Sequence, residues 1–425
     1  MKITPVKKIS GELAVPGDKS ISHRAIMLGS IAKGMTEIHG FLESADCLST
    51  AACFARMGIQ IEKSARTVTV HGRGLHGLKA PDGILDCGNS GTTTRLLSGL
   101  LAPQNFDVVL TGDESIQKRP MKRVIDPLTD MGARIQSVHG NGCAPLQICG
   151  SRLTGIRYNS PVASAQVKSA ILLAGLYADG KTSVTEPSLS RNHTELMLRQ
   201  FGGSVTSEGL TAGVLPAGEL YGQRVCVPGD ISSAAYFIAA ALLLPHSEVL
   251  IRNVGINKTR AGILEVCRQM GASIEIANAT GKAGDPSADL FVRSASLKGV
   301  TVGGPIIPTL IDELPMIAAM ACFAKGTTVI RDAAELRVKE SNRIAIMVDS
   351  LRAMGADIEE TEDGMQIRGG RPLHGARIDT HKDHRIAMTL AVTALAAEGE
   401  TELLDADCVR ISYPGFYEDL GRLTV

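Results

Sequence analysis

The sequence predicts an α/β protein of two domains built from six related units, and three observations lead to this prediction. A polar segment followed by an apolar helix and a strand occurs six times. A second helix, which ends in a Met-Gly or Phe-Gly pair before a strand, keeps step with it. The chain of 425 residues is longer than one hydrophobic core usually serves, which favours two domains of about 200 residues each.

The first copy of the repeat spans residues 16–41, PGDKSISHRAIMLGSIAKGMTEIHGF. Pro and Gly break regular structure, polar residues follow, and the apolar run from Ala25 to Ile31 has helical spacing. Gly34 fits a helix C-terminus, and MTEIHGF fits a strand. The same pattern returns in residues 88–102, 164–187, 228–254, 312–333 and 383–406.

The second element of the repeat reads ARMGIQIE, DMGARIQ, RQFGGSVT, RQMGASIEI and RAMGADIEE. Copies lie roughly 65 to 85 residues apart, too far for a solenoid, so we expect α/β units with two helices and short strands. Because Pro228-Gly229 repeats Pro16-Gly17, we expect the chain to cross between domains at both places. One domain would then be residues 17–227, and the other residues 1–16 with 228–425.

Composition excludes several classes of protein. Lys plus Arg and Asp plus Glu number 44 each, so nothing in the overall charge favours nucleic acid or membrane, and any anion site must be local. The nine cysteines are scattered without paired metal-ligand spacing, as in a reduced cytosolic protein. Neither a signal peptide nor an apolar run long enough for a bilayer is evident. We expect a soluble, cytoplasmic monomer.

Polar clusters stand at the predicted helix starts, where unpaired backbone N–H groups attract anions. In the first copy these are Lys19, Ser20 and Arg24, and we expect Lys19 to be exposed. Helical spacing places Ser20 and Arg24 on one face. For a single copy, a capped helix with solvated charges explains the pattern as well as anion binding does, but six copies favour binding.

Two further segments of the first half are candidate anion sites. Residues 88–95, GNSGTTTR, form a glycine- and hydroxyl-rich helix entry that can bring backbone amides close to a phosphate, although no Walker motif follows. Residues 111–123 carry four cations, for which a solvated charge run is the usual explanation. Pro120 nevertheless fixes the backbone beside Arg119, and a positioned Arg can clamp an anion with two hydrogen bonds.

The second half mixes acids and bases at its helix starts. Asp312 and Glu313 begin one helix, where a carboxylate could simply be the cap. Lys339 and Arg343 are four residues apart, which predicts a common helical face, and residues 382–385, KDHR, precede an apolar helix. Such crowding is typical of a site that moves protons beside bound anions.

Eight motifs occur along the chain in the order PGDKSISHR, GNSGTTTR, QKRP, SAQVKSA, SRNHTE, DELP, LRVKES and DHRIAM. Together they resemble the EPSP synthase family, the 3-phosphoshikimate 1-carboxyvinyltransferases. The resemblance runs essentially from end to end, and it is specific because the motifs agree in order and spacing. It implies two domains, each an inside-out α/β barrel of three βαβαββ units around a cleft that closes on substrate. It also implies that the 5-hydroxyl of shikimate 3-phosphate adds to phosphoenolpyruvate, and that the adduct loses phosphate without cofactor or metal.

The resemblance assigns roles to residues of this chain. The catalytic groups it implies are Lys19, Asp312 and Glu340. The implied ligands of shikimate 3-phosphate are Lys19, Ser20, Arg24, Ser164, Gln166, Arg191, Asp312 and Lys339. The implied ligands of phosphoenolpyruvate are Lys19, Asn89, Gly91, Arg119, Gln166, Arg343, His384, Arg385 and Arg410.

The chain departs from the family pattern in four places. Ala165 replaces a second serine, and Ser190-Arg191 replaces a Lys-Pro-Tyr string, so we expect Arg191 to contact the phosphate. Glu335 replaces an asparagine that contacts the sugar-like ring in some members. Arg410 replaces a lysine near phosphoenolpyruvate, which keeps the charge but changes its geometry.

Two other functions are open alternatives. The related UDP-N-acetylglucosamine enolpyruvyl transferase uses the same donor, but it carries a reactive cysteine in a flexible loop. The corresponding residues 111–123 contain none, and Ser20 stands where that enzyme has asparagine. A non-catalytic anion-binding scaffold does not explain why acids, bases and phosphate-type ligands coexist at most helix starts.

Gly91→Ala tests the implied donor loop. We expect weaker binding of phosphoenolpyruvate-site ligands and nearly unchanged affinity for shikimate 3-phosphate, because a side chain would obstruct the approach of backbone to ligand. Equilibrium titration of each ligand measures both affinities. Equal loss of both would mean that the loop is structural.

Overall fold

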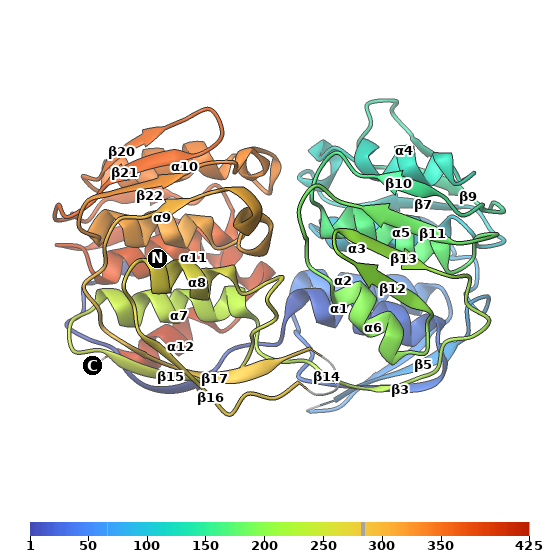
Figure 1. The fold of residues 1–425 in the computed structure, drawn as a ribbon, viewed down its shortest axis with the longest axis horizontal. Helices are drawn as coiled ribbons and strands as arrows, with labels where there is room; N and C mark the ends of the chain where they lie inside the picture. Colours follow the sequence, from blue (N-terminus) through green and yellow to red (C-terminus); the bar gives the residue numbers. More distant parts are fainter. Residues whose placement is uncertain (66, 282–284, 425) are drawn as a thin grey trace. The chain divides into compact units, whose positions relative to one another are not determined.

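The computed structural model describes residues 1–65, 67–281 and 285–424. The chain forms two compact units, Gly17–Val227 and Met1–Pro16 with Pro228–Val425 (Figure 1). The strands form six small sheets, three in each unit, which confirms the predicted α/β fold of six repeats. Within the described ranges, no helix is long and apolar enough to cross a membrane.

The repeat is seen in full in residues 85–149. Its two leading strands are parallel, its last strand is antiparallel to both neighbours, and the sheet order is β6-β7-β9-β8. The elements are β6 (Leu85–Asp86), α3 (Gly91–Leu101), β7 (Val108–Thr111), η1 (Ile116–Lys118), α4 (Lys122–Asp130), β8 (Arg134–Ser137) and β9 (Leu146–Cys149).

Within the described ranges, the other repeats have four-stranded sheets of the same plan, except the last, whose sheet has three strands. In the unit Gly17–Val227 they contain α1 (Lys19–Ile31), β3 (Lys33–His39), α2 (Ala45–Arg56), β4 (Gln60–Lys63), β5 (Thr67–Arg73) and β14 (Arg224–Cys226), and β10 (Arg157–Asn159), α5 (Ala165–Gly175), β11 (Thr182–Thr185), α6 (His193–Gln200), β12 (Val205–Glu208) and β13 (Thr211–Val214). The first repeat of the second unit has β2 (Ser10–Ala14), α7 (Ile231–Leu243), β15 (Glu248–Gly255), α8 (Gly262–Gln269), β16 (Ile274–Ala277) and β17 (Ser287–Arg293). The next has β18 (Thr301–Val302), η2 (Gly304–Thr309), α9 (Leu314–Phe323), β19 (Thr327–Ile330), η3 (Ala334–Val338), α10 (Arg343–Ala353), β20 (Asp357–Glu360) and β21 (Met365–Arg368). The last has β22 (Arg377–Asp379), α11 (His384–Leu395), β23 (Thr401–Leu404), η4 (Ala406–Ile411), α12 (Phe416–Leu423) and β1 (Lys2–Ile3).

Next to each of the two chain crossings, a strand pairs with a repeat that is not its neighbour in the sequence. Strand β2 precedes α1 in the chain but pairs in parallel with β15. Strand β14 precedes α7 in the chain but pairs in parallel with β3. The N-terminal strand β1 pairs with β23 and completes the last sheet. The exchange places both ends of the chain in one unit.

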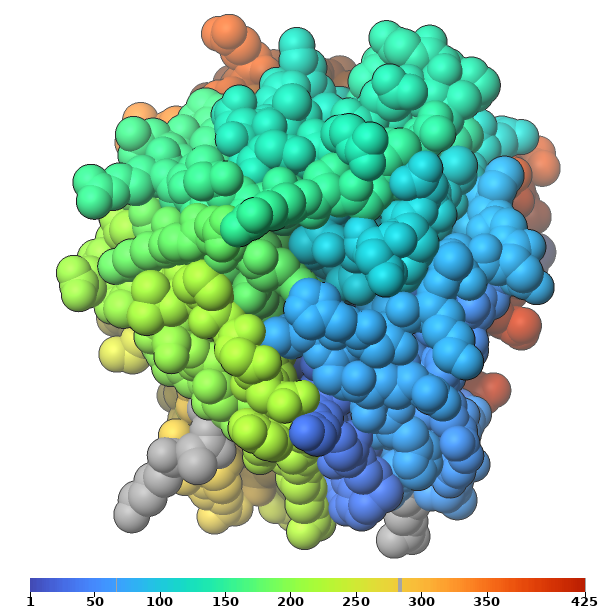
Figure 2. Space-filling view, turned by 90° about the vertical axis from the view of Figure 1, so that its right-hand side faces the viewer, coloured from blue at the N-terminus to red at the C-terminus, as the bar shows by residue number. Residues whose placement is uncertain are grey.

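The first helix of each repeat lies in the core of its unit. Figure 1 shows α1, α3 and α5 in one unit, and α7, α9 and α11 in the other, lying among the sheets. In α7 every residue from Ile231 to Leu242 is buried, as expected of a helix that is apolar all round. Figure 2 shows one face of the unit Gly17–Val227, where the three repeats, coloured blue, cyan and green, occupy separate sectors.

The Met-Gly and Phe-Gly pairs end helices as predicted. The glycine of each pair has a positive φ, between 85° and 97°, which only glycine adopts without strain. The turn it makes sends the chain back toward the sheet. These residues are Gly58, Gly132, Gly202, Gly271 and Gly355.

Gly99→Ala will destabilise the protein, because α3 and α5 approach each other too closely for a side chain. A Cβ on Gly99 would lie 2.1 Å from the carbonyl oxygen of Ala170. The backbone of α5 cannot move away from it without a cost in free energy. We expect a loss of about 1–3 kcal/mol in chemical denaturation. Gly421→Ala, also inside a helix but with no atom within 4 Å of its Cβ, is the control and should gain up to about 1 kcal/mol. Equal losses in both variants would contradict the close approach.

Candidate active site

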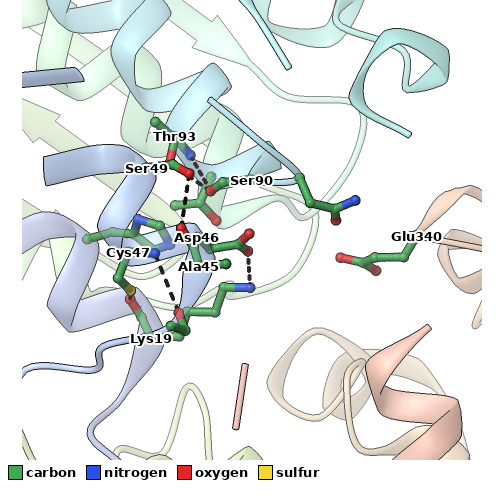
Figure 3. A network of polar contacts seen from close by, with 12 residues as sticks. Lys19, Ala45, Asp46, Cys47, Ser49, Ser90, Thr93 and Glu340 are labelled. Carbon is green, nitrogen blue, oxygen red and sulfur yellow. Dashed lines mark hydrogen bonds and ion pairs between the residues drawn. The ribbon is translucent and has the colours of Figure 1, made fainter. Parts of the chain in front are cut away.

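Lys19 forms an ion pair with Asp46 at the start of two neighbouring helices (Figure 3). Asp18 caps α1 by accepting from the amide of Ile21 at 2.9 Å, so Lys19 is the first residue of that helix. Its side chain is only 16% exposed and that of Asp46 5%. The expectation that Lys19 is exposed is therefore wrong, because the first turn of α2 packs over it.

A chain of hydroxyl groups joins the starts of α1, α2 and α3. His23 Nδ1 lies 2.7 Å from Thr50 Oγ1, which lies 2.6 Å from Thr93 Oγ1, and Thr93 donates to Ser90 Oγ at 2.7 Å. Burial and the charges of Lys19 and Arg24 hold the pKa of His23 well below its usual range. The imidazole is therefore neutral at physiological pH and serves to align these helices.

Arg24 is buried, and neutral oxygens orient its guanidinium. It donates to Thr194 Oγ1 at 2.6 Å, to Ser169 Oγ at 2.7 Å and to the carbonyl of Ser20 at 2.9 Å. The contact with Ser20 matches their predicted common face. Burial lowers the pKa of Arg24 to about 10, so it stays charged at neutral pH.

Arg119 is not a solvated charge. It is 7% exposed and donates to Asn89 Oδ1 at 3.2 Å and to Ser115 Oγ at 3.1 Å. Asn89 in turn donates to Asp113 Oδ2 at 2.6 Å. The loop of residues 111–123 and the entry of α3 are thus tied together.

Gly91 leaves room for two guanidinium groups. A Cβ there would lie 2.8 Å from Nη1 of Arg95 and 3.1 Å from Nη1 of Arg119. Arg95 donates to Gln166 Oε1 at 2.6 Å, and Gln166 donates to Thr92 Oγ1 at 2.9 Å. We did not assign Arg95 from the sequence, although it lies one helical turn after Gly91.

The remaining predicted residues of this unit lie at or beside helix starts. Ser164 caps α5 and accepts from the amide of Val167 at 3.4 Å. Ser20 and Arg191 are half-buried.

Arg343 organises the carboxylates of the other unit. It is 1% exposed and contacts Asp383 at 2.9 Å, Glu340 at 2.6 Å and Asp312 at 3.3 Å. Burial lowers its pKa, but these three carboxylates outweigh burial and raise the pKa above its ordinary value. Arg343 thus holds three carboxylates in place.

Lys339 does not share a helical face with Arg343, so that prediction is wrong. The short helix η3 ends at Val338, Lys339 is extended, and α10 begins only at Arg343. Asn342 starts the new helix by accepting from the amide of Ala345 at 3.3 Å. Lys339 is half-buried, and burial lowers its pKa despite the nearby carboxylates.

The side chain of Glu313 in the DELP motif does not cap α9. Glu313 stands at the N-cap position of α9 but makes no capping bond, and it accepts instead from Ser232. Arg260, which is buried, lies 3.7 Å from Asp312, 3.6 Å from Glu313 and 3.0 Å from Asp230. The sequence did not predict a role for Arg260, because a single basic residue before α8 does not indicate that it pairs with carboxylates about 50 residues later.

His384 and Arg385 begin α11 and are buried at 1% and 6% exposure. Arg385 Nε lies 3.9 Å from Asp312, which brings it to the carboxylates. Arg410 lies exposed on η4, and no hydrogen bond or ion pair in the described ranges links it to the other predicted residues. Across those same ranges, no group of three or more His, Cys, Asp or Glu side chains is arranged to hold a metal.

Asp383→Asn will lower stability and flatten its acid dependence. Burial raises the pKa of Asp383, but Arg343 outweighs it and the net pKa is lowered. Its carboxylate therefore stabilises the fold fully above the ordinary pKa of about 3.9, and this contribution is lost as pH falls below that value. We expect a loss of roughly 3 kcal/mol at pH 7 and a smaller loss toward pH 3. Urea denaturation across this range measures both.

Glu400→Gln is the control for this variant, because it removes the carboxylate of an exposed pair with Lys2. Surface pairs contribute little, so its stability curve should follow that of the unmodified protein. If Asp383→Asn followed the same curve, the buried pair would not be a source of acid sensitivity.

Comparison with known proteins identifies the family. Residues 3–420 match the sequence model of EPSP synthase (3-phosphoshikimate 1-carboxyvinyltransferase). The chain is 54% identical over 416 residues to the 3-phosphoshikimate 1-carboxyvinyltransferase of Geobacter sp. (strain M21), covering 97% of this chain and 96% of that protein. It is also 54% identical over 422 residues to the protein of that name from Geobacillus kaustophilus, with 99% of each chain covered.

Solved structures agree. The EPSP synthase of Acinetobacter baumannii superimposes with a TM-score of 0.89 at 47% identity, covering 100% of this chain and 98% of that one. The enolpyruvyl transferase NikO of Streptomyces tendae, at 19% identity and a TM-score of 0.81, shares the fold. The chain belongs to the EPSP synthase family, and it is a transferase that catalyses the enolpyruvyl transfer of the shikimate pathway in aromatic amino acid biosynthesis.

Proposed function

We propose that Lys19, Asp312 and Glu340 carry the protons when the 5-hydroxyl of shikimate 3-phosphate adds to phosphoenolpyruvate. The observation that carries this proposal is the pairing of each group with an opposite charge. Asp46 faces Lys19, and Arg343 faces both Asp312 and Glu340. A hydrogen-bonded opposite charge holds each of these groups in place, which suits a lysine that donates a proton and carboxylates that accept one.

The proton balance matches this inventory. Addition removes a proton from the hydroxyl and places one on the methylene carbon of phosphoenolpyruvate. Elimination removes a proton from the new methyl group as phosphate leaves. We assign acceptance of the hydroxyl proton to Asp312, donation of a proton to the methylene carbon to Lys19, and removal of a proton from the new methyl group to Glu340.

Two substrates that each carry a phosphate and a carboxylate repel one another, so fixed cations must hold them. We propose shikimate 3-phosphate contacts for Lys19, Ser20, Arg24, Ser164, Gln166, Arg191, Asp312 and Lys339. We propose phosphoenolpyruvate contacts for Lys19, Asn89, Gly91, Arg119, Gln166, Arg343, His384, Arg385 and Arg410. Buried, hydrogen-bonded Arg24 and Arg119 support these assignments. Residues 17–227 would supply one part of the set, and residues 1–16 with 228–425 the other.

We further propose a cytoplasmic monomer that needs neither cofactor nor metal. The enol phosphate of the donor supplies the reactive carbon, and side chains supply the protons. All nine cysteines are free thiols, as in a reducing compartment.

One assay tests the assignment of substrates. With chelator present, the protein should release inorganic phosphate from shikimate 3-phosphate plus phosphoenolpyruvate and form the enolpyruvyl ether. UDP-N-acetylglucosamine should not replace the acceptor. Phosphate release only with the nucleotide sugar would support the related enzyme instead, and no release with either acceptor would support a binding protein.

Lys19→Met should lower kcat by about 10² or more, the scale of lost general acid catalysis. Because Lys19 pairs with the buried Asp46, the single variant leaves a carboxylate without its partner. Lys19→Met with Asp46→Asn restores neutrality and separates lost folding from lost chemistry. Circular dichroism checks the fold of both variants. An active and folded double variant would contradict the role of Lys19.

A further inference from the structure

We propose that Glu186, held by the buried Lys168, is a positioning residue for the shikimate 3-phosphate side of the site. It would set the two segments Ser164–Gln166 and Ser190–Arg191 at once. This inference rests on the proposed function, in which these segments contact shikimate 3-phosphate.

Lys168, Glu186 and Glu195 form a buried charge triad. Lys168 Nζ lies 2.9 Å from Glu186 Oε2 and 2.9 Å from Glu195 Oε1. The three side chains are 2%, 1% and 3% exposed. Lys168 also donates to the carbonyl of Ser190 at 3.4 Å. Water is excluded, so these charges depend on one another for their solvation.

Of the two carboxylates in the triad, Glu186 is the one whose described hydrogen bonds join both the segment Ser164–Gln166 and the segment Ser190–Arg191. Its Oε1 accepts from the backbone amide of Ser164 at 2.9 Å, at the cap of α5. Its Oε2 accepts from the hydroxyl of Ser190 at 2.8 Å, next to Arg191. The backbone of Glu186 is anchored to the sheet, because its amide donates to the carbonyl of Leu210 at 3.0 Å.

This geometry connects the triad to the ligand groups. Holding Ser164 sets the first turn of α5, and with it Gln166, which Arg95 also contacts. Holding Ser190 by both its hydroxyl and its carbonyl sets the neighbouring Arg191. Apolar side chains could hold α5 and α6 together without the free-energy cost of burying charges. A carboxylate, in contrast, can accept hydrogen bonds from two separate segments and so fix the distance between them.

Glu186→Gln and Glu195→Gln form a matched pair of variants. Each removes one charge at the same distance from Lys168 and keeps the side-chain volume. In Glu186→Gln the amide NH2 group must face either the Ser164 amide or the Lys168 ammonium, and donors cannot pair. In Glu195→Gln the contacts of Glu186 with Ser164 and Ser190 remain.

We expect Glu186→Gln to raise the KM and the Kd for shikimate 3-phosphate by about 3- to 10-fold, the effect of about one hydrogen bond. The KM for phosphoenolpyruvate and kcat should change by less than about twofold. Glu195→Gln should leave both KM values within about twofold, even if its melting temperature falls. Steady-state kinetics, titration of shikimate 3-phosphate and thermal denaturation give these readouts.

An equal rise in KM for both variants would overturn the proposal, since the triad would then act only by general stability. So would an unchanged KM in folded Glu186→Gln. If Glu186→Gln does not fold, Ser190→Ala removes its hydroxyl contact without altering the triad charges, and should raise the KM for shikimate 3-phosphate alone. Failure of the unmodified protein to use shikimate 3-phosphate would instead refute the proposed function.

Discussion

The close packing of three apolar helices in each unit is the constraint on which the rest of the structure depends. Helices α1, α3 and α5 are buried along most of their length, so their polar first turns must meet one another. Arg24 of α1 therefore reaches Ser169 of α5, and Arg95 of α3 reaches Gln166 of α5. In the other unit, Ser232 of α7 reaches Glu313 of α9 for the same reason. Packing of apolar surface thus gathers chemical groups at one end of each helix bundle.

The two units solve different electrostatic problems. In residues 17–227, neutral oxygens accept from Arg24 and the charges of Glu195 and Asp18 oppose the effect of its burial, while burial keeps His23 neutral. In the second unit, buried Arg343 holds three carboxylates that would otherwise repel one another, and buried Arg260 lies beside one of them. The first arrangement suits anion binding, and the second suits proton transfer beside bound anions.

Predictions from the sequence were correct where they depend on one residue or its immediate neighbours. They were wrong where they depend on contacts with another helix or on where a new helix begins. The glycine after each second helix predicted a turn correctly, because a positive φ is a property of that residue alone. The common face of Lys339 and Arg343 was wrong, because Asn342 starts a new helix between them. The exposure of Lys19 was wrong because Asp46 comes from the next helix of the repeat.

The sequence by itself determined the six repeats, the α/β fold and the family, since apolar periodicity and motif order are written along the chain. Only the tertiary structure decided which charges meet. Three buried ion pairs join residues that are 18 to 52 positions apart in the sequence and more than one element apart along the chain. They are Arg260 with Asp312, Arg343 with Asp383, and Lys168 with Glu186. Helix packing brings these pairs together. A buried charge needs an opposite charge beside it, but the sequence does not show which residue will supply that charge.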